Sequence, residues 1–250
     1  MSLYYERDGI TIYHGDCLDV LPTLAGVDHV ITDPPYSDAS HAMHDAGKRW
    51  AQRQDGLVRA ELRFDSIDGP YIESVLNAVA VARWAVFTMD ERIASWLRVS
   101  QPRGFKYVRT GVWVKPGSMP QFTGDRPAMG YEPVVIMHAA GSRTRWNGGG
   151  RAGVWQFPPV HGEHPTQKPL ALYRSFVELF TDPGEVILDP FMGSGTTLLA
   201  ALNLGRRAIG IEREEKWCEA AAKRLEGPVS RNPEQLGLKL DEGHDYGHAR

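Results

Sequence analysis

A short apolar run at residues 186–188 leads directly into the segment Asp189-Pro190-Phe191-Met192-Gly193-Ser194-Gly195-Thr196, and a helical pattern follows. This order of strand, glycine turn and helix is typical of open α/β sheets, which bind ligands at the carboxyl ends of their strands. Glycine has no Cβ, so the backbone at 193 and 195 can pass close to a ligand. The segment therefore predicts an α/β fold with a binding site where this strand ends.

The rest of the chain predicts further alternation of strands and helices. We expect strands at 10–13, 27–32, 84–88, 105–114, 132–138, 185–188 and 207–211, and helices at 17–24, 71–83, 91–99, 170–180, 196–204 and 214–225. This alternation predicts a mostly parallel, twisted sheet with helices on both faces. The 250 residues suffice for one such domain. We expect a single catalytic domain at 1–227 with insertions at 37–69 and 115–162, and a polar tail at 228–250.

The acidic residues around the glycine loop narrow the choice of ligand. The loop has neither a third helix-packing glycine nor a Gly-Lys-Ser/Thr ending, so a dinucleotide or a phosphate loop fits poorly. Asp189 would repel a pyrophosphate but suits a cationic ammonium group. Glu212 ends the next predicted strand, where a carboxylate can accept hydrogen bonds from ribose hydroxyls. The two glycines alone could form an ordinary tight turn. Together with Asp189 and Glu212, they favour a ligand-binding site.

A second segment, Asp33-Pro34-Pro35-Tyr36, begins where the predicted strand at 27–32 ends. Proline restricts the backbone, so the Asp33 carboxylate and the Pro34 carbonyl have fixed directions. These two acceptors can receive both hydrogens of an amino group, and Tyr36 offers an aromatic face for a flat ring. A Pro-Pro turn with a buried tyrosine is the alternative. Both segments at strand ends of one chain favour a catalytic interpretation.

With these segments in this order, the chain resembles the beta class of DNA amino-methyltransferases, in which the catalytic segment precedes the cofactor loop. The likeness covers residues 10–225. It implies a Rossmann-like, S-adenosylmethionine-dependent methyltransferase fold with a circularly permuted order of motifs. It also implies methyl transfer to an exocyclic nitrogen of a base that is flipped out of double-stranded DNA.

The resemblance assigns roles to individual residues. It implies a catalytic segment formed by Asp33, Pro34, Pro35 and Tyr36. It implies cofactor contacts from Asp16, Cys17, Thr166, Gln167, Lys168, Asp189, Pro190, Phe191, Gly193, Ser194, Gly195, Thr196 and Glu212. Asp-Pro-Pro-Tyr is commoner among adenine-N6 enzymes, whereas cytosine-N4 enzymes more often begin with Ser. We therefore expect adenine N6 as the acceptor, with cytosine N4 as the alternative.

Two other functions use similar residues. Enzymes that methylate RNA or a protein glutamine carry related segments, but they usually place the cofactor loop before the catalytic segment. A DNA-binding module that has lost catalysis is the non-enzymatic alternative, and intact Asp33, Tyr36, Asp189 and Glu212 argue against it.

Charge and composition limit the partners. The formal net charge is −3, yet basic residues dominate the stretch from Arg92 to Arg151, which predicts one positive face for DNA. Arginines paired on a solvated surface would give the same pattern. No cysteine pair or ligand spacing indicates a metal, no apolar run is long enough to span a membrane, and no secretory signal opens the chain. We expect a cytoplasmic monomer or homodimer.

Overall fold

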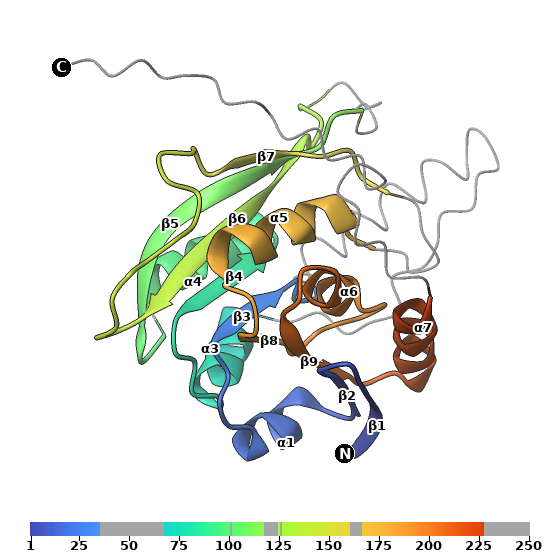
Figure 1. Ribbon diagram of the computed structural model, residues 1–250. Helices are drawn as coiled ribbons and strands as arrows, with labels where there is room; N and C mark the ends of the chain where they lie inside the picture. The colour runs from blue at the N-terminus through green and yellow to red at the C-terminus, as the bar shows by residue number, and fades with distance from the viewer. Residues whose placement is uncertain (36–67, 101, 118–124, 126, 161–166, 228–250) are drawn as a thin grey trace.

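The computed structural model describes residues 1–35, 68–100, 102–117, 125, 127–160 and 167–227. The predicted insertion at 37–69 lies almost wholly outside these residues, as do parts of the 115–162 insertion and the tail at 228–250. The described strands form one sheet in the order β1-β2-β9-β8-β3-β4-β6-β5-β7 (Figure 1). They are β1 (Ser2–Arg7), β2 (Ile10–His14), β3 (His29–Thr32), β4 (Trp84–Thr88), β5 (Phe105–Val114), β6 (Tyr131–Ala139), β7 (Val154–Gln156), β8 (Val186–Asp189) and β9 (Arg207–Glu212).

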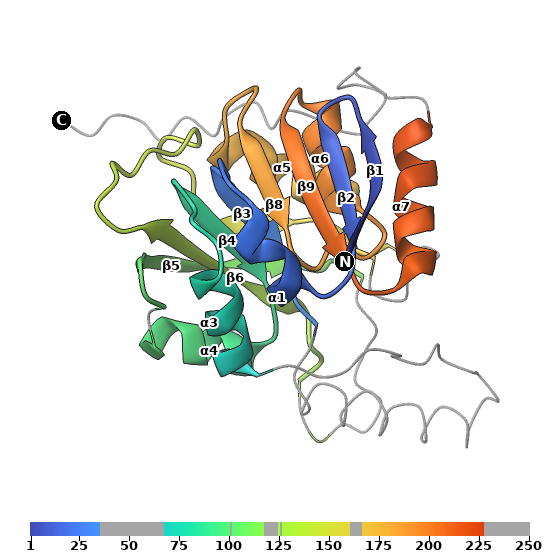
Figure 2. The ribbon, with the colours of Figure 1, turned by 90° about the horizontal axis from the view of Figure 1, so that it is seen from below.

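Helices cover both faces of this sheet (Figures 1 and 2). A buried cluster on one face contains residues of α1 (Cys17–Val20), α3 (Gly69–Asn77) and α4 (Glu91–Ser100). The cluster on the other face contains residues of α5 (Leu170–Phe180), α6 (Thr196–Asn203) and α7 (Glu215–Glu226). A single 3-10 turn, Leu21–Thr23, follows α1. Every residue of β3, β4 and β8 is buried, as expected for strands covered on both sides. The predicted α/β fold with a mostly parallel sheet is confirmed.

Strand direction fixes where the ends of the strands lie. Strands β2, β9, β8, β3 and β4 are all parallel to one another. Strand β6 runs antiparallel to both β4 and β5, so β5 points the same way as β4. The carboxyl ends of these six strands and the first residues of β6 therefore meet at one edge, which we call the carboxyl edge.

The structure departs from the sequence expectation at three elements. The helix expected at 71–83 ends at Asn77, because the following residues leave the helix and Val81 forms a parallel bridge with Val27. The edge strands β1 and β7 were not expected. Strand β1 is connected to β2 by the turn Asp8-Gly9, in which both residues have positive φ, as a two-residue hairpin turn requires.

Among the described helices, none is long and apolar enough to cross a membrane.

Gly195 is the point where the glycine loop meets α7. Its φ is +75°, and a Cβ at this position would lie 2.8 Å from the Cβ of Ala221. Gly184 also has a positive φ, +83°, but has open space where its Cβ would be. Comparing alanine substitutions at these two positions therefore separates the effect of backbone strain from the effect of a steric clash.

We predict that Gly195→Ala lowers the free energy of unfolding by roughly 2–5 kcal/mol, because it adds a clash to the strain of a left-handed alanine. Gly184→Ala is the matched control, with an expected cost of roughly 1–2 kcal/mol from the strain alone. Urea unfolding followed by circular dichroism measures both. Equal losses in the two variants would show that α7 does not restrict position 195.

Candidate active site

Polar side chains occupy the carboxyl edge at the end of one strand after another. Strand order, rather than sequence order, decides which of them are neighbours, because adjacent strands lie about 5 Å apart. Across β2, β9, β8, β3, β4, β6 and β5 the row reads Asp16, Glu212, Asp189, Asp33, Thr88, Glu132 and Lys115. Residues far apart in the chain thus form one continuous site.

Asp33 follows β3 directly and lies near the middle of this row. Its Oδ1 accepts a hydrogen bond from Thr88 Oγ1 at 2.8 Å, and its Oδ2 accepts one from Lys168 Nζ at 2.5 Å. The hydroxyl groups of Thr88 and Tyr173 are 2.8 Å apart, so α5 supports the threonine from behind. The Asp33 side chain keeps 18% of its surface exposed, which leaves it accessible to a ligand.

Burial raises the pKa of Asp33 above its ordinary value. Lys168 opposes this shift, while the negative charge of Glu132 adds to it. The carboxyl group is therefore held by two donors and yet is a better proton acceptor than an aspartate in water.

Glu132 and Lys115 extend the row of charges beyond Asp33. Glu132 Oε2 lies 3.6 Å from Lys168 Nζ, and its Oε1 accepts a hydrogen bond from Lys115 Nζ. Burial alone would raise the pKa of Glu132, but the two lysines lower it below its ordinary value. Lys115, Glu132, Lys168 and Asp33 thus alternate in sign, and we call these four residues the charge chain.

Asp189 fixes the start of the glycine loop. Its Oδ1 accepts hydrogen bonds from Thr32 Oγ1 at 2.5 Å and from the Phe191 backbone N–H at 3.1 Å. Its Oδ2 accepts one from Thr197 Oγ1 at 2.5 Å. A carboxylate has about four acceptor positions, so one remains for a ligand. Burial raises the pKa of Asp189 to about 6.

Glu212 and Arg224 hold the loop from two further sides. Glu212 Oε2 accepts a hydrogen bond from the Gly193 N–H at 3.1 Å, and its Oε1 accepts one from the Glu214 N–H at 2.8 Å. Arg224 of α7 donates to the Ser194 carbonyl at 2.5 Å and to its hydroxyl at 2.9 Å. Burial raises the pKa of Glu212. The loop is therefore preorganised around glycines whose φ angles are positive.

This half of the row suits an elongated ligand that carries hydroxyl groups and a cationic amine. Asp16, Glu212 and Asp189 end three adjacent strands and thus span roughly 10 Å. Asp16 caps α1 through the Leu18 N–H at 2.8 Å. Cys17 is buried, with its Sγ 3.5 Å from the hydroxyl of Tyr71. In the part of the chain that the structure describes, no group of three or more His, Cys, Asp or Glu could hold a metal ion.

Most of the residues predicted for the site meet at this edge, including Asp33, Pro34, Pro35 and the loop from Asp189 to Thr196. Tyr36 and Thr166 lie outside the described residues, and Gln167 is half-buried. Lys168, which was expected at the cofactor, has its ammonium group on Asp33. The sequence analysis missed Thr88, Glu132, Lys115 and Tyr173. Thr88 could have been found by asking which residue ends β4, the strand beside β3, and Glu132 by asking which residues begin β6, the next strand.

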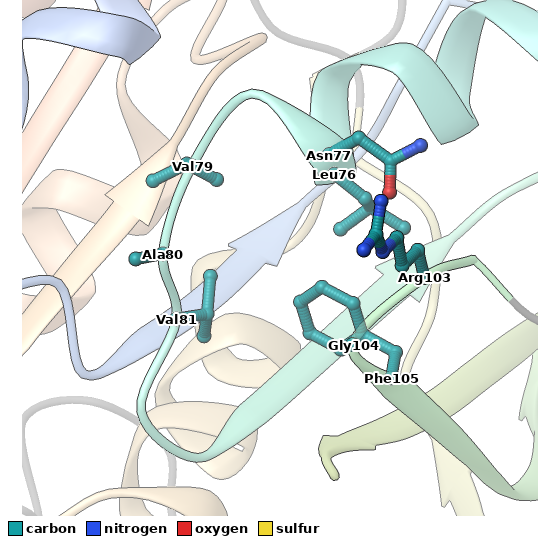
Figure 3. A pocket seen from close by; sticks show the side chains of 8 residues that line it. All are labelled: Leu76, Asn77, Val79, Ala80, Val81, Arg103, Gly104 and Phe105. Atoms are coloured by element: carbon teal, nitrogen blue, oxygen red, sulfur yellow. The ribbon is translucent and has the colours of Figure 1, made fainter.

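The opposite edge of the sheet has a different character. A hollow of about 520 Å³ lies there (Figure 3), and it is lined by Leu76, Asn77, Val79, Ala80, Val81, Arg103, Gly104 and Phe105. None of these residues is an acid or a nucleophile. Arg103 and Lys106 lie at the start of β5, at this opposite edge, whereas Lys115 lies at the carboxyl edge. The basic residues from 92 to 151 therefore do not all gather beside Asp33.

Comparison with known proteins agrees with this geometry. The family model for DNA methylases matches residues 27–223. The chain is 28% identical over 272 residues to the type II methyltransferase M.XycI of Xanthomonas campestris pv. cyanopsidis, and the match covers 89% of each protein. The crystal structure of the M1.HpyAVI–SAM complex has a TM-score of 0.64 at 29% identity and covers 86% of this chain and 100% of that one. The cytosine-N4-specific PvuII DNA methyltransferase shares the fold, with a TM-score of 0.68 at 16% identity over 94% of this chain and 92% of that one.

Proposed function

The chain belongs to the DNA methylase family, whose members use S-adenosylmethionine to methylate adenine N6 or cytosine N4, and from this premise we propose that it acts on the N6 amino group of adenine in double-stranded DNA. The observation that carries the proposal is the position of Asp33. It ends β3, and β3 is the immediate neighbour of β8, from which the glycine loop begins. An amine held by Asp33 would therefore lie beside the cofactor. The aspartate at the first position of the catalytic segment favours adenine.

We assign the cofactor to the half of the row from Asp16 to Asp189. Glu212 would accept hydrogen bonds from the ribose hydroxyls, and the remaining acceptor position of Asp189 would face the ammonium group. Cys17 and Asp16, at the end of β2, would contact the adenine. When bound, S-adenosylmethionine supplies a methyl group that is already activated by the positive charge on sulfur. The protein therefore has to prepare the acceptor nitrogen and align it.

Asp33 and the Pro34 carbonyl would prepare that nitrogen. The lone pair of an exocyclic amine is delocalised into the base. Hydrogen bonds from its two N–H groups to these acceptors localise the lone pair on nitrogen and stabilise the positive charge that develops there. Thr88 and Lys168 use two of the roughly four acceptor positions of the carboxylate, which leaves room for the amine. Once methylated, the nitrogen carries an acidic proton that the Asp33 carboxylate can accept.

We predict that the modified base is N6-methyladenine. The test is to incubate the protein with S-adenosylmethionine labelled in its methyl group and with DNA from a host that lacks DNA methylation. Digestion to nucleosides and mass spectrometry then identify the product. Label in N4-methylcytosine would overturn the adenine assignment while leaving the family intact.

Asp33→Asn should lower the rate of methyl transfer by about 100-fold or more, because the variant loses the charge that stabilises the developing cation. Cofactor affinity should change little. The matched control is Asp28→Asn, because Asp28 precedes β3, as Asp33 follows it, and its side chain accepts a hydrogen bond from the Val186 N–H at 2.9 Å. Single-turnover kinetics and calorimetry with the cofactor give both numbers. Full activity in Asp33→Asn would remove this residue from the mechanism.

Cofactor affinity should decline as the pH falls below about 6. The pKa of Asp189 is raised to about 6, so the carboxylate is protonated below this pH and loses the charge that pairs with the ammonium group. Each further pH unit should weaken binding by up to about tenfold. 5′-Methylthioadenosine is the control ligand because it keeps the adenine and ribose but lacks the ammonium. Identical pH dependence for the two ligands, measured by calorimetry, would contradict the pairing.

A further inference from the structure

We propose that Glu132 is a positioning residue for the methyl transfer, which acts on Asp33 through Lys168 and sets the strength of that carboxylate as a proton acceptor. The inference rests on the proposed role of Asp33 and adds a residue that neither the catalytic segment nor the glycine loop contains. Glu132 is the second residue of β6, which lies two strands away from β3 in the sheet. Its negative charge acts on Asp33 across this distance, and the Lys168 ammonium group lies between the two carboxylates.

The contacts of Lys168 link the two carboxylates. Its Nζ is 2.5 Å from Asp33 Oδ2 and 3.6 Å from Glu132 Oε2, so one ammonium group lies between two carboxylates. The Lys168 side chain is only 5% exposed and that of Glu132 only 10%. Water screens such buried charges poorly, and each one acts strongly on its neighbours. Lys115, on the far side of Glu132, is 17% exposed and closes the charge chain.

Charged and titratable groups reach Asp33 from every element packed around it. Lys168, before α5, lowers its pKa, and so does the hydrogen bond from Thr88 of β4. Glu132 of β6 raises it. Asp189 of β8 is close enough to interact electrostatically with Asp33, and Tyr173 of α5 lies behind Thr88. Glu132 is thus the member of this set that offsets Lys168 from outside the proposed cofactor and substrate contacts.

The balance matters because Lys168 has two opposite effects on catalysis. Its hydrogen bond holds the Asp33 carboxylate in one orientation, which helps to align the amine. Its charge also weakens Asp33 as a base. Because Glu132 partly offsets the ammonium charge, the hydrogen bond from Lys168 to Asp33 can persist while the Asp33 carboxylate remains able to take the proton from the methylated amine. Lys115 pairs with Glu132 on its far side and so limits how far Glu132 can offset Lys168.

A purely structural ion pair is the competing explanation. Removing Glu132 would then cost stability, since it leaves Lys168 with less compensation in a buried position. It would not move the pH dependence of the reaction. The two explanations therefore differ in the pH profile and agree in thermal stability.

The experiment compares the pH profiles of single-turnover methyl transfer to unmethylated DNA for two variants with opposite expected shifts. The acidic limb of each profile is the range in which the rate falls because Asp33 becomes protonated. Glu132→Gln removes a negative charge near Asp33, so this limb should move to lower pH by roughly half a unit or more. Lys115→Met removes the positive charge at Nζ, which lies 4.7 Å from the centroid of the Trp113 ring, and keeps a side chain of similar length, so the acidic limb should move to higher pH. Glu132→Asp, which keeps the charge, should restore the wild-type limb. Unchanged limbs in both charge variants, or shifts of the same sign, would overturn the proposal.

Glu185→Gln is the matched control. Glu185 is also a partly buried carboxylate, ion-paired with Arg83 at 2.6 Å and hydrogen-bonded to His29 at 2.8 Å, but it lies just before β8 at the opposite edge. The Glu185→Gln variant should have a lower melting temperature and an unchanged pH profile. Asp33→Asn distinguishes a failure of the proposed role of Asp33 from a failure of the proposed role of Glu132. If that variant stays active, the role of Asp33 fails; if it is inactive while the limbs of Glu132→Gln and Lys115→Met do not move, only the role of Glu132 fails.

Discussion

The shared direction of the central strands is the constraint on which the site depends. Because β2, β9, β8, β3 and β4 are parallel, each delivers its following loop to the same edge, and hydrogen bonding between strands fixes the spacing of those loops. Asp33 and Asp189 are separated by more than 150 residues in sequence, yet they end adjacent strands. The glycine loop and Asp33 therefore need no domain movement to meet.

Placing so many carboxylates at one edge has an electrostatic cost, which the structure offsets locally. Asp189 is buried against hydroxyl and backbone donors that carry no net charge, and its pKa rises to about 6. Asp33 has an ammonium partner instead, and its charge is compensated directly. The difference suits the two tasks proposed for these residues. A carboxylate compensated only by dipoles still attracts a cation, whereas one that must orient an amine and later take its proton benefits from a fixed partner.

The sequence predicted much of this arrangement because the central elements have strong local signals. The strand at 105–114 and the helix at 170–180 have the bounds observed for β5 and α5, and the apolar run before Asp189 forms β8. Edge strands carry weaker signals, since β1 is mostly exposed and β7 has only three residues. The polar partners of Asp33 were missed for a different reason. Thr88 and Glu132 come near Asp33 only through strand order, which sequence periodicity does not contain, whereas Lys168, which was expected at the cofactor, reaches Asp33 from the loop before α5.

The reversal of β6 explains why the charge chain can exist at all. In an all-parallel sheet, the strand beside β4 would bring another strand end to the carboxyl edge. Because β6 is antiparallel, it begins there instead, and the register pairs its Glu132 with Trp113 of β5, two residues before Lys115. An acid and a base from consecutive strands are thus fixed side by side. Lys168 joins them from the loop before α5, so three separate elements converge on the carboxylate that ends β3. The antiparallel strand is therefore the part of the fold that connects the β5–β6 end of the sheet to Asp33.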